Sequence, residues 1–117
     1  MRKKGGTSFT VCVGGEIYTD SEYNSLYNAH RNRFAKIFLG KLITVKGIVN
    51  SLTTCDSYSE YSFDNSVEVS QAFLINLDDN NPLLSQLETG DKVIVMGKLV
   101  YVDGFYSILN YASLEKI

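Results

Sequence analysis

The sequence predicts a mainly β domain, a five-stranded Greek-key barrel with one amphipathic helix in front of it. Three observations lead to this prediction. Apolar residues recur at helical spacing between residues 21 and 39, whereas most of the chain after Gly40 alternates as strands do. A short apolar segment after Pro82 predicts a helical turn between the third and fourth strands. That order of elements is expected of a small Greek-key barrel.

The composition describes one ordinary globular domain. The chain has 117 residues, of which 44% are hydrophobic and 21% are charged, and this length and balance suit a single core. No apolar run approaches the length of about 20 residues that a membrane-spanning helix needs. The basic start "MRKKGG" is not followed by the continuous apolar segment of a signal peptide, so we expect a cytoplasmic protein that binds no membrane.

The expected organisation is one domain over residues 20–117, with a helix at about residues 21–39 and a barrel at about residues 41–117. Residues 1–19 are rich in glycine and weakly patterned. We expect them to form an N-terminal arm or to contain a short strand.

The helix has clear signals at both ends. Thr19 and Glu22 have the spacing of a capping box, and Gly40 is suited to follow the last helical residue. Between them, apolar residues spaced by three or four positions predict one apolar stripe. This stripe consists of Tyr23, Leu26, Tyr27, His30, Phe34, Ile37 and Phe38. The opposite, solvent side of the helix carries Asn24, Asn28, Asn32 and Lys36.

Turn residues separate the expected strands of the barrel. The segment after Gly40 alternates as a strand, and residues 67–77 are expected to form a second long strand. Between these two, residues 53–66 are expected to be either a long loop or a loop with a short strand near residues 61–63. Asp103-Gly104 lies between two later apolar runs and is typical of a β-hairpin.

Two glycines interrupt strands that are otherwise apolar. Gly47 and Gly97 are expected where a barrel strand bends sharply or where a neighbouring backbone approaches closely. Lys46 and Lys98 lie beside them in the sequence. Because the first and fourth strands of such a barrel pair, we expect these two lysines on neighbouring strands.

Two sets of spaced residues, with the closing "ILNYASLEK", resemble the tRNA-anticodon-binding-like OB-fold family. The likeness covers about residues 20–117. It implies an OB barrel and a candidate binding face rather than a particular activity. The residues that carry it are Asn28, Ala35, Gly40, Lys41, Ile43, Val45, Gly47 and Val49, and then Leu87, Gly90, Asp91, Val93, Val95, Gly97 and Leu99.

Charge is segregated along the chain, although the formal net charge is only −2. Residues 23–55 include five basic residues and no acid, whereas residues 47–91 include eight acids and neither Lys nor Arg. Such segregation of charge bears on which partners the protein binds and gives no information about its fold.

The expected function is a non-catalytic binding module, nominally for single-stranded nucleic acid. An OB barrel binds single-stranded nucleic acid or oligosaccharide across its second and third strands and the loops beside them. Nucleic acid needs aromatic faces for stacking and cations along the path of its backbone. The candidate residues are Arg31, Arg33, Lys41, Lys46, Lys92, Lys98, Tyr101 and Tyr106.

The acidic middle of the chain favours an alternative, a protein-interaction module. Segment 56–68 would repel a polyanion, but it suits a basic protein surface and would suit an inhibitor that mimics nucleic acid. The sequence leaves both interpretations, and the oligomeric state, open. The candidate residues of the alternative are Asp56, Tyr58, Glu60, Tyr61, Asp64 and Glu68.

We expect neither catalysis nor a cofactor or metal. The sequence has no P-loop, dinucleotide or nucleophile motif, and its single histidine, His30, excludes zinc sites built on several histidines. The "DDNN" segment, residues 78–81, lacks the spacing of a calcium loop and is interpreted as a turn. Cys12 and Cys55 are far apart in the sequence and are expected to be free thiols.

Overall fold

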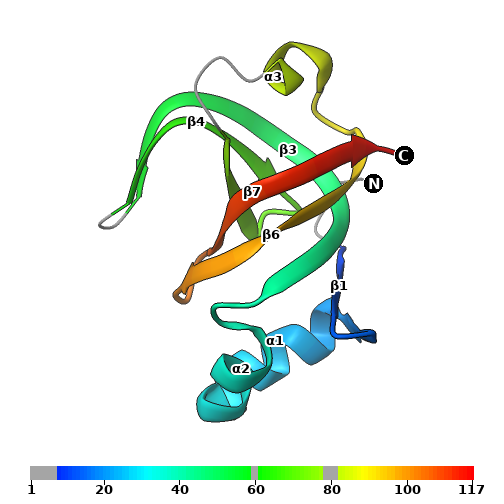
Figure 1. The fold of residues 1–117 in the computed structure, drawn as a ribbon, viewed down its shortest axis with the longest axis vertical. Helices are drawn as coiled ribbons and strands as arrows, with labels where there is room; N and C mark the ends of the chain where they lie inside the picture. Colours follow the sequence, from blue (N-terminus) through cyan, green and yellow to red (C-terminus); the bar gives the residue numbers. More distant parts are fainter. Residues whose placement is uncertain (1–7, 59–60, 78–81) are drawn as a thin grey trace, which may run out of the picture.

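The computed structural model describes residues 8–58, 61–77 and 82–117, without the side chains of residues 53–58, 61–65, 83 and 84. Two helices lie at one end of a β-barrel, and a third, short helix lies near the other end (Figure 1). The helices are α1 (Asp20–Ala29), α2 (Arg31–Phe38) and α3 (Leu83–Gln86). The strands are β1 (Thr10–Val13), β2 (Glu16–Thr19), β3 (Leu42–Tyr58), β4 (Tyr61–Val69), β5 (Phe73–Leu77), β6 (Lys92–Val102) and β7 (Ser107–Lys116).

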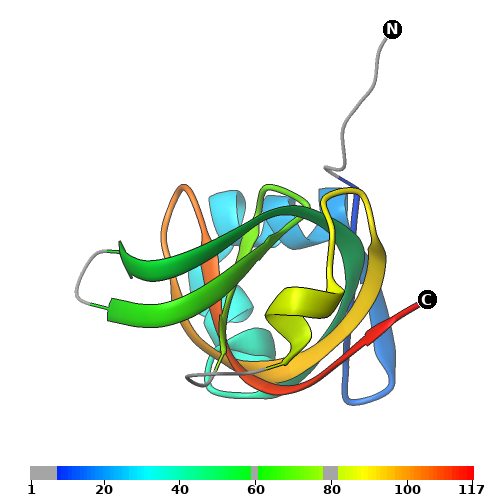
Figure 2. The ribbon, with the colours of Figure 1, turned by 90° about the horizontal axis from the view of Figure 1, so that it is seen from above.

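Five strands close the barrel. They are hydrogen-bonded in the order β3-β4-β5-β7-β6, and β6 also pairs with β3, which completes the ring seen in Figure 2. The pairings are antiparallel except for β5 with β7, which is parallel. This strand order and the helix between β5 and β6 are those of an OB barrel, so the predicted fold class is confirmed.

Strand β3 is long because it pairs with two different barrel strands along its length. Its first half, from Leu42 to Ile48, pairs with β6, and its second half, from Val49 to Tyr58, pairs with β4. Alternate side chains of the first half point into the barrel, where Ile43 and Val45 are completely buried. The alternating apolar residues of the sequence are therefore the ones whose side chains point into the barrel.

The prediction of a loop over residues 53–66 is wrong, although the short strand allowed near residues 61–63 falls within β4. Strands β3 and β4 continue through this region and pair as far as Tyr58 with Tyr61. Pairing of β4 with β5 begins only at Asn65, so the end of the hairpin projects from the barrel as a two-stranded ribbon (Figure 1). The sequence of this region is polar and has no apolar alternation, so the usual signal of a strand is absent from it.

The single strand expected at residues 67–77 is also wrong. It is divided into β4 and β5 by a turn in which Ser70 and Gln71 both have a φ of 53°. Ser70 is buried, and its hydroxyl donates to the carbonyl of Ser8 at 2.7 Å. Neither turn residue is a glycine or proline, so the sequence carries no strong turn signal at this point.

The N-terminal segment contributes more than an arm. Within residues 1–19, strands β1 and β2 form an antiparallel hairpin. Strand β1 also pairs with the first half of β3, on the edge away from β6, with Val11 opposite Val45. The hairpin thus adds two strands to the sheet without becoming part of the closed ring.

The predicted helix is broken in two at His30, whose φ and ψ are −142° and 61°. The capping box of Thr19 and Glu22 is confirmed. In one straight helix, Tyr23 and Phe38 would be about 22 Å apart along the axis, at 1.5 Å per residue. Their ring centroids are 4.9 Å apart, because the break lets α2 fold back. Both helices therefore bring rings from the predicted stripe into one cluster.

Tyr23 lies at the centre of this aromatic cluster. Its ring contacts Phe34 of α2 and Phe73 of β5, with centroids 4.9 and 5.5 Å away. Its hydroxyl lies 2.7 Å from Ser107 Oγ, which is also buried. Burial raises the pKa of the Tyr23 hydroxyl above its ordinary value, so the group stays neutral. The helix pair is therefore fastened to the end of the barrel by apolar packing and one buried hydrogen bond.

Gly97 lies where a neighbouring backbone approaches closely, as expected from the sequence, whereas Gly47 is approached by side chains. A Cβ atom at Gly97 would lie 2.5 Å from the carbonyl oxygen of Asn110, and one at Gly47 would lie 2.6 Å from Val69 Cγ1. Both positions are close approaches between neighbouring strands. The predicted hairpin at Asp103-Gly104 is also confirmed, although its loop has four residues between β6 and β7.

Candidate functional site

Three of the predicted cations lie on the same, outer side of the β3–β6 pair. Lys46, Lys92 and Lys98 alternate with buried residues along their strands, and all three are exposed. Among the described residues none of them forms an ion pair. We call this surface the lysine face.

The three lysines are spread along the strands rather than clustered. Lys46 is opposite Ile94, four residues from Lys98, which places the two lysines about 13 Å apart at 3.3 Å per residue. Lys92 and Lys98, six residues apart on β6, span about 20 Å. The prediction that Lys46 and Lys98 lie on neighbouring strands is confirmed, but they are not opposite each other.

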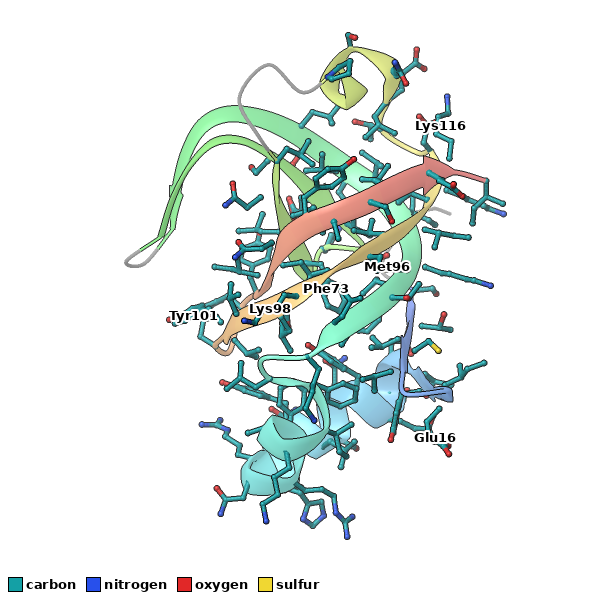
Figure 3. The ribbon with its side chains drawn as sticks, viewed as in Figure 1. Glu16, Phe73, Met96, Lys98, Tyr101 and Lys116 are labelled. Atoms are coloured by element: carbon teal, nitrogen blue, oxygen red, sulfur yellow. The ribbon has the colours of Figure 1, made fainter. Side chains whose placement is uncertain are left out.

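Apolar side chains separate these cations. Met96 lies between Lys92 and Lys98 on the outer side of β6 and is 36% exposed, and Leu42, opposite Lys98, is 57% exposed. A hollow of about 280 Å³ also lies between Lys46 and Lys92. Figure 3 labels Lys98 and Met96 on this surface. The lysine face thus combines positive charge with exposed apolar area.

The other basic candidates lie at the helices, apart from the lysine face. The Arg31 guanidinium lies 4.4 Å from the centroid of the Tyr27 ring, and its Nε donates to the Tyr27 carbonyl at 3.1 Å. Arg33 is exposed on α2. Lys41 donates from Nζ to the carbonyl of Lys36 at 2.8 Å, near the C-terminal end of α2.

The outer face of β4 and β5, where an OB barrel usually binds its ligand, has a carboxylate at its centre. Glu68 accepts hydrogen bonds from the hydroxyls of Ser51 and Tyr106, both at 3.1 Å. Leu74 and Ile108 form a small buried cluster beside it. A hollow of about 330 Å³ lies beside Glu68 and Tyr106, and neither Lys nor Arg lines it.

The two aromatic candidates are packed onto that cluster. Tyr101 and Tyr106 both contact it, and the Tyr101 hydroxyl also donates to Asp103 Oδ2 at 3.3 Å. Figure 3 shows Tyr101 near the end of β6 that leads into the β6–β7 loop. The rings therefore cover Leu74 and Ile108, and this packing limits their use as stacking platforms.

A polar row across three strands was missed from the sequence. Lys98 is opposite Asn110, and Asn110 is opposite Asn76. The Asn76 amide donates to Asn110 Oδ1 at 3.5 Å. These residues are far apart in the sequence and meet only because β7 lies between β5 and β6, so no local pattern signals the row.

Most of the candidates for the protein-binding alternative lie outside the described residues, either wholly or in their side chains. Only Glu68 is described fully, and it belongs to the barrel rather than to the projecting hairpin. The remaining candidates are Asp56, Tyr58, Glu60, Tyr61 and Asp64.

The predicted turn at residues 78–81 also lies outside the described residues, as does Cys55 in its side chain. Cys12 is a half-buried free thiol. Within the described ranges, no group of three or more His, Cys, Asp or Glu residues is arranged to hold a metal ion. No helix in the same ranges has the length and apolar character needed to cross a membrane.

Comparison of the chain with protein families, with characterised proteins and with solved structures gave no match.

Proposed function

We propose that this chain is a non-catalytic binding module for single-stranded nucleic acid, and that the phosphate backbone follows the lysine face. The observation that carries the proposal is the placement of Lys46, Lys92 and Lys98 on one exposed surface about 20 Å long. A phosphate backbone that passes these ammonium groups releases counterions, and this release favours binding of any sequence.

We place the nucleic acid on the lysine face, rather than on the face where an OB barrel usually binds its ligand, for an electrostatic reason. Glu68 lies on the outer face of β4, and residues 47–91 include neither Lys nor Arg. A polyanion on that face would be repelled, whereas the lysine face offers three cations without a paired acid among the described residues. The exposed side chain of Met96 supplies an apolar surface for bases between the lysines.

The test is a fluorescence anisotropy titration with short single-stranded DNA and RNA at several salt concentrations. Three phosphate contacts predict a slope of about −2 for the logarithm of the affinity against the logarithm of salt concentration, at about −0.7 per contact. Lys46→Gln and Lys98→Gln are each expected to weaken binding and to reduce this slope by about 0.7.

Lys36→Gln is the matched control, because it removes the same charge from an exposed position on α2. It is expected to leave the slope unchanged. Absence of binding at micromolar protein in low salt would refute the proposal. Equal effects of all three substitutions would show that net charge, rather than the lysine face, governs binding.

A basic protein partner is the second candidate function. It is favoured by the eight acids within residues 47–91 and by the projection of the β3–β4 hairpin away from the barrel (Figure 2). A hairpin that extends from a rigid barrel is accessible to a partner, and its charge would steer a basic surface toward it.

This candidate is tested by a salt-dependent pull-down from nuclease-treated lysate with the wild type and a variant combining Asp56→Asn, Glu60→Gln and Asp64→Asn. Glu115→Gln, which removes an exposed acid from β7, is the control. Capture of a basic protein by the wild type and the control but not by the triple variant supports this function. Equal capture by all three proteins argues against it.

A further inference from the structure

Another hollow lies between α1 and the β6–β7 loop, away from the lysine face. It has a volume of about 330 Å³ and is lined from one side by α1 and from the other by Val102–Ser107. Small-molecule sites commonly have volumes of about 300–1,000 Å³. We call it the loop groove. The buried hydrogen bond between Tyr23 and Ser107 lies where these two walls meet.

Aromatic residues line the loop groove on both sides. Tyr27, on α1, is held by the edge of Phe34, 5.3 Å away between centroids, and by the guanidinium of Arg31. Phe105, on the loop, is 79% exposed, so the face of its ring is available for a ligand to stack on.

The loop that carries Phe105 is shaped before any ligand binds. Asp103 Oδ1 accepts hydrogen bonds from the backbone amides of Phe105 and Tyr106, at 2.7 and 3.0 Å. The Tyr106 hydroxyl is held by Glu68 at 3.1 Å. These contacts reduce the conformational entropy that the loop would lose on binding.

The polar groups of the groove are amides rather than charges. Asn24 and Asn28 are four residues apart on α1, so they share one face of the helix, and both line the groove. Within the described residues, neither side-chain amide makes a hydrogen bond. The sequence pattern assigned them to the solvent side of the helix, because it gave no information on the loop that lies opposite. An asparagine amide offers one donor group and one acceptor to a ligand edge.

The charged residues in and beside the loop groove indicate which charge its ligand carries. Neither Lys nor Arg lines the loop groove, and the Asp103 carboxylate is used by its own loop. The guanidinium of Arg31 lies over the ring of Tyr27, which lines the groove. Aromatic walls with amides between them suit a flat, neutral ring with donors and acceptors on its edge, and a cation beside them suits an attached phosphate.

We infer that the loop groove binds one unstacked base of the single-stranded nucleic acid that follows the lysine face. This inference rests on the proposed function and adds a base-recognition site to it. The base stacks on Phe105, and its edge is hydrogen-bonded by Asn24 and Asn28. Because an asparagine amide pairs with the adjacent donor and acceptor of adenine, adenine is the preferred base.

The first experiment measures oligonucleotide affinity for Phe105→Ala and for the double variant Asn24→Ala with Asn28→Ala. Loss of one stacked base is expected to weaken binding about 5- to 150-fold in Phe105→Ala, with the salt slope unchanged. The double variant is expected to lose the preference for adenine-containing strands. Asn32→Ala, at an exposed asparagine of α2 outside the loop groove, is the control and is expected to bind as the wild type does.

The second experiment titrates adenosine and, separately, uridine into the isotopically labelled protein and follows amide chemical shifts by NMR. Adenosine is expected to shift resonances of α1 and of the β6–β7 loop more than uridine does. Oligonucleotide binding that is unaffected by Phe105→Ala, with no adenosine shifts, would refute the loop-groove inference and leave the proposed function standing. Adenosine shifts without oligonucleotide binding would refute the proposed function and support the base site.

Discussion

Gly97 offers the sharpest test of how the barrel closes. Adding one methyl group, in Gly97→Ala, would place a Cβ atom 2.5 Å from the carbonyl oxygen of Asn110 and 3.2 Å from Leu109 Cβ. The oxygen belongs to the backbone of β7, which is hydrogen-bonded into the sheet between β5 and β6. It cannot rotate away as a side chain would, so the two strands must separate locally.

The size of the effect follows from two opposing contributions. Overpacking of this kind costs about 1–3 kcal/mol, and a backbone obstacle places Gly97→Ala near the upper value. Replacing glycine also restricts the unfolded chain, which stabilises by about 0.4–1 kcal/mol. We therefore expect the free energy of unfolding to fall by about 2 kcal/mol. For a chain of this length, about 4 °C per kcal/mol gives a decrease in Tm of roughly 8 °C.

The assay is thermal and urea unfolding followed by circular dichroism, with Gly104→Ala as the matched control. A Cβ at Gly104 would have no neighbour within 4 Å, and its φ is not positive. The control should be as stable as the wild type or slightly more stable. If Gly97→Ala unfolds at the same temperature as Gly104→Ala, the close approach of β6 and β7 does not have the energetic role assigned to it.

Three further substitutions probe the helix pair. Thr19→Ala removes the side-chain acceptor of the capping box and should lower the free energy of unfolding by about 1 kcal/mol, measured by urea unfolding; no change would show that the cap is not needed. Tyr23→Phe leaves the buried Ser107 hydroxyl without its partner and should cost about 1–3 kcal/mol. Combining it with Ser107→Ala should cost less than the sum of the two single changes, and strict additivity would contradict the hydrogen bond. Phe38→Ala removes a completely buried ring that packs against Tyr23 and should cost about 3–5 kcal/mol; a loss below 1 kcal/mol would argue against the packing of α2 onto Tyr23.

Local signals in the sequence were sufficient wherever the structure depends on neighbours along the chain. The capping box starts α1 at Asp20, directly after Thr19, because the side-chain and backbone partners are three residues apart. The alternation around Ile43 and Val45 marks the inner face of β3, because successive side chains of a strand point to opposite sides. These two features were predicted correctly for the reasons given.

The errors share one cause, since each depended on a distant segment. The helix break at His30 has no glycine or proline, and it exists because Phe34 and Phe38 pack onto Tyr23 at the end of the barrel. The strands through residues 53–66 are paired between β3 and β4, and the polar sequence there has no apolar alternation that signals this pairing. Intrinsic propensity is a weak guide where tertiary contacts compete with it.

In the candidate site, too, the sequence identified residues but not which distant segments they would meet. Lys46 and Lys98 were expected on neighbouring strands and Lys92 was chosen from its charge, and closure of β6 onto β3 places all three on one surface. Asn24 and Asn28 were assigned to the solvent side of a helix, and the β6–β7 loop, about 75 residues later in the sequence, turns that side into a wall of the loop groove.

The sequence by itself therefore determined the class of barrel, the start of its helix and the segregation of its charges, since periodicity, capping and composition are local properties. Only the tertiary structure decided where those charges lie relative to one another and which rings remain exposed. The physical reason is that barrel closure brings together residues far apart in the chain, and their burial and pairing depend on contacts that no short segment encodes.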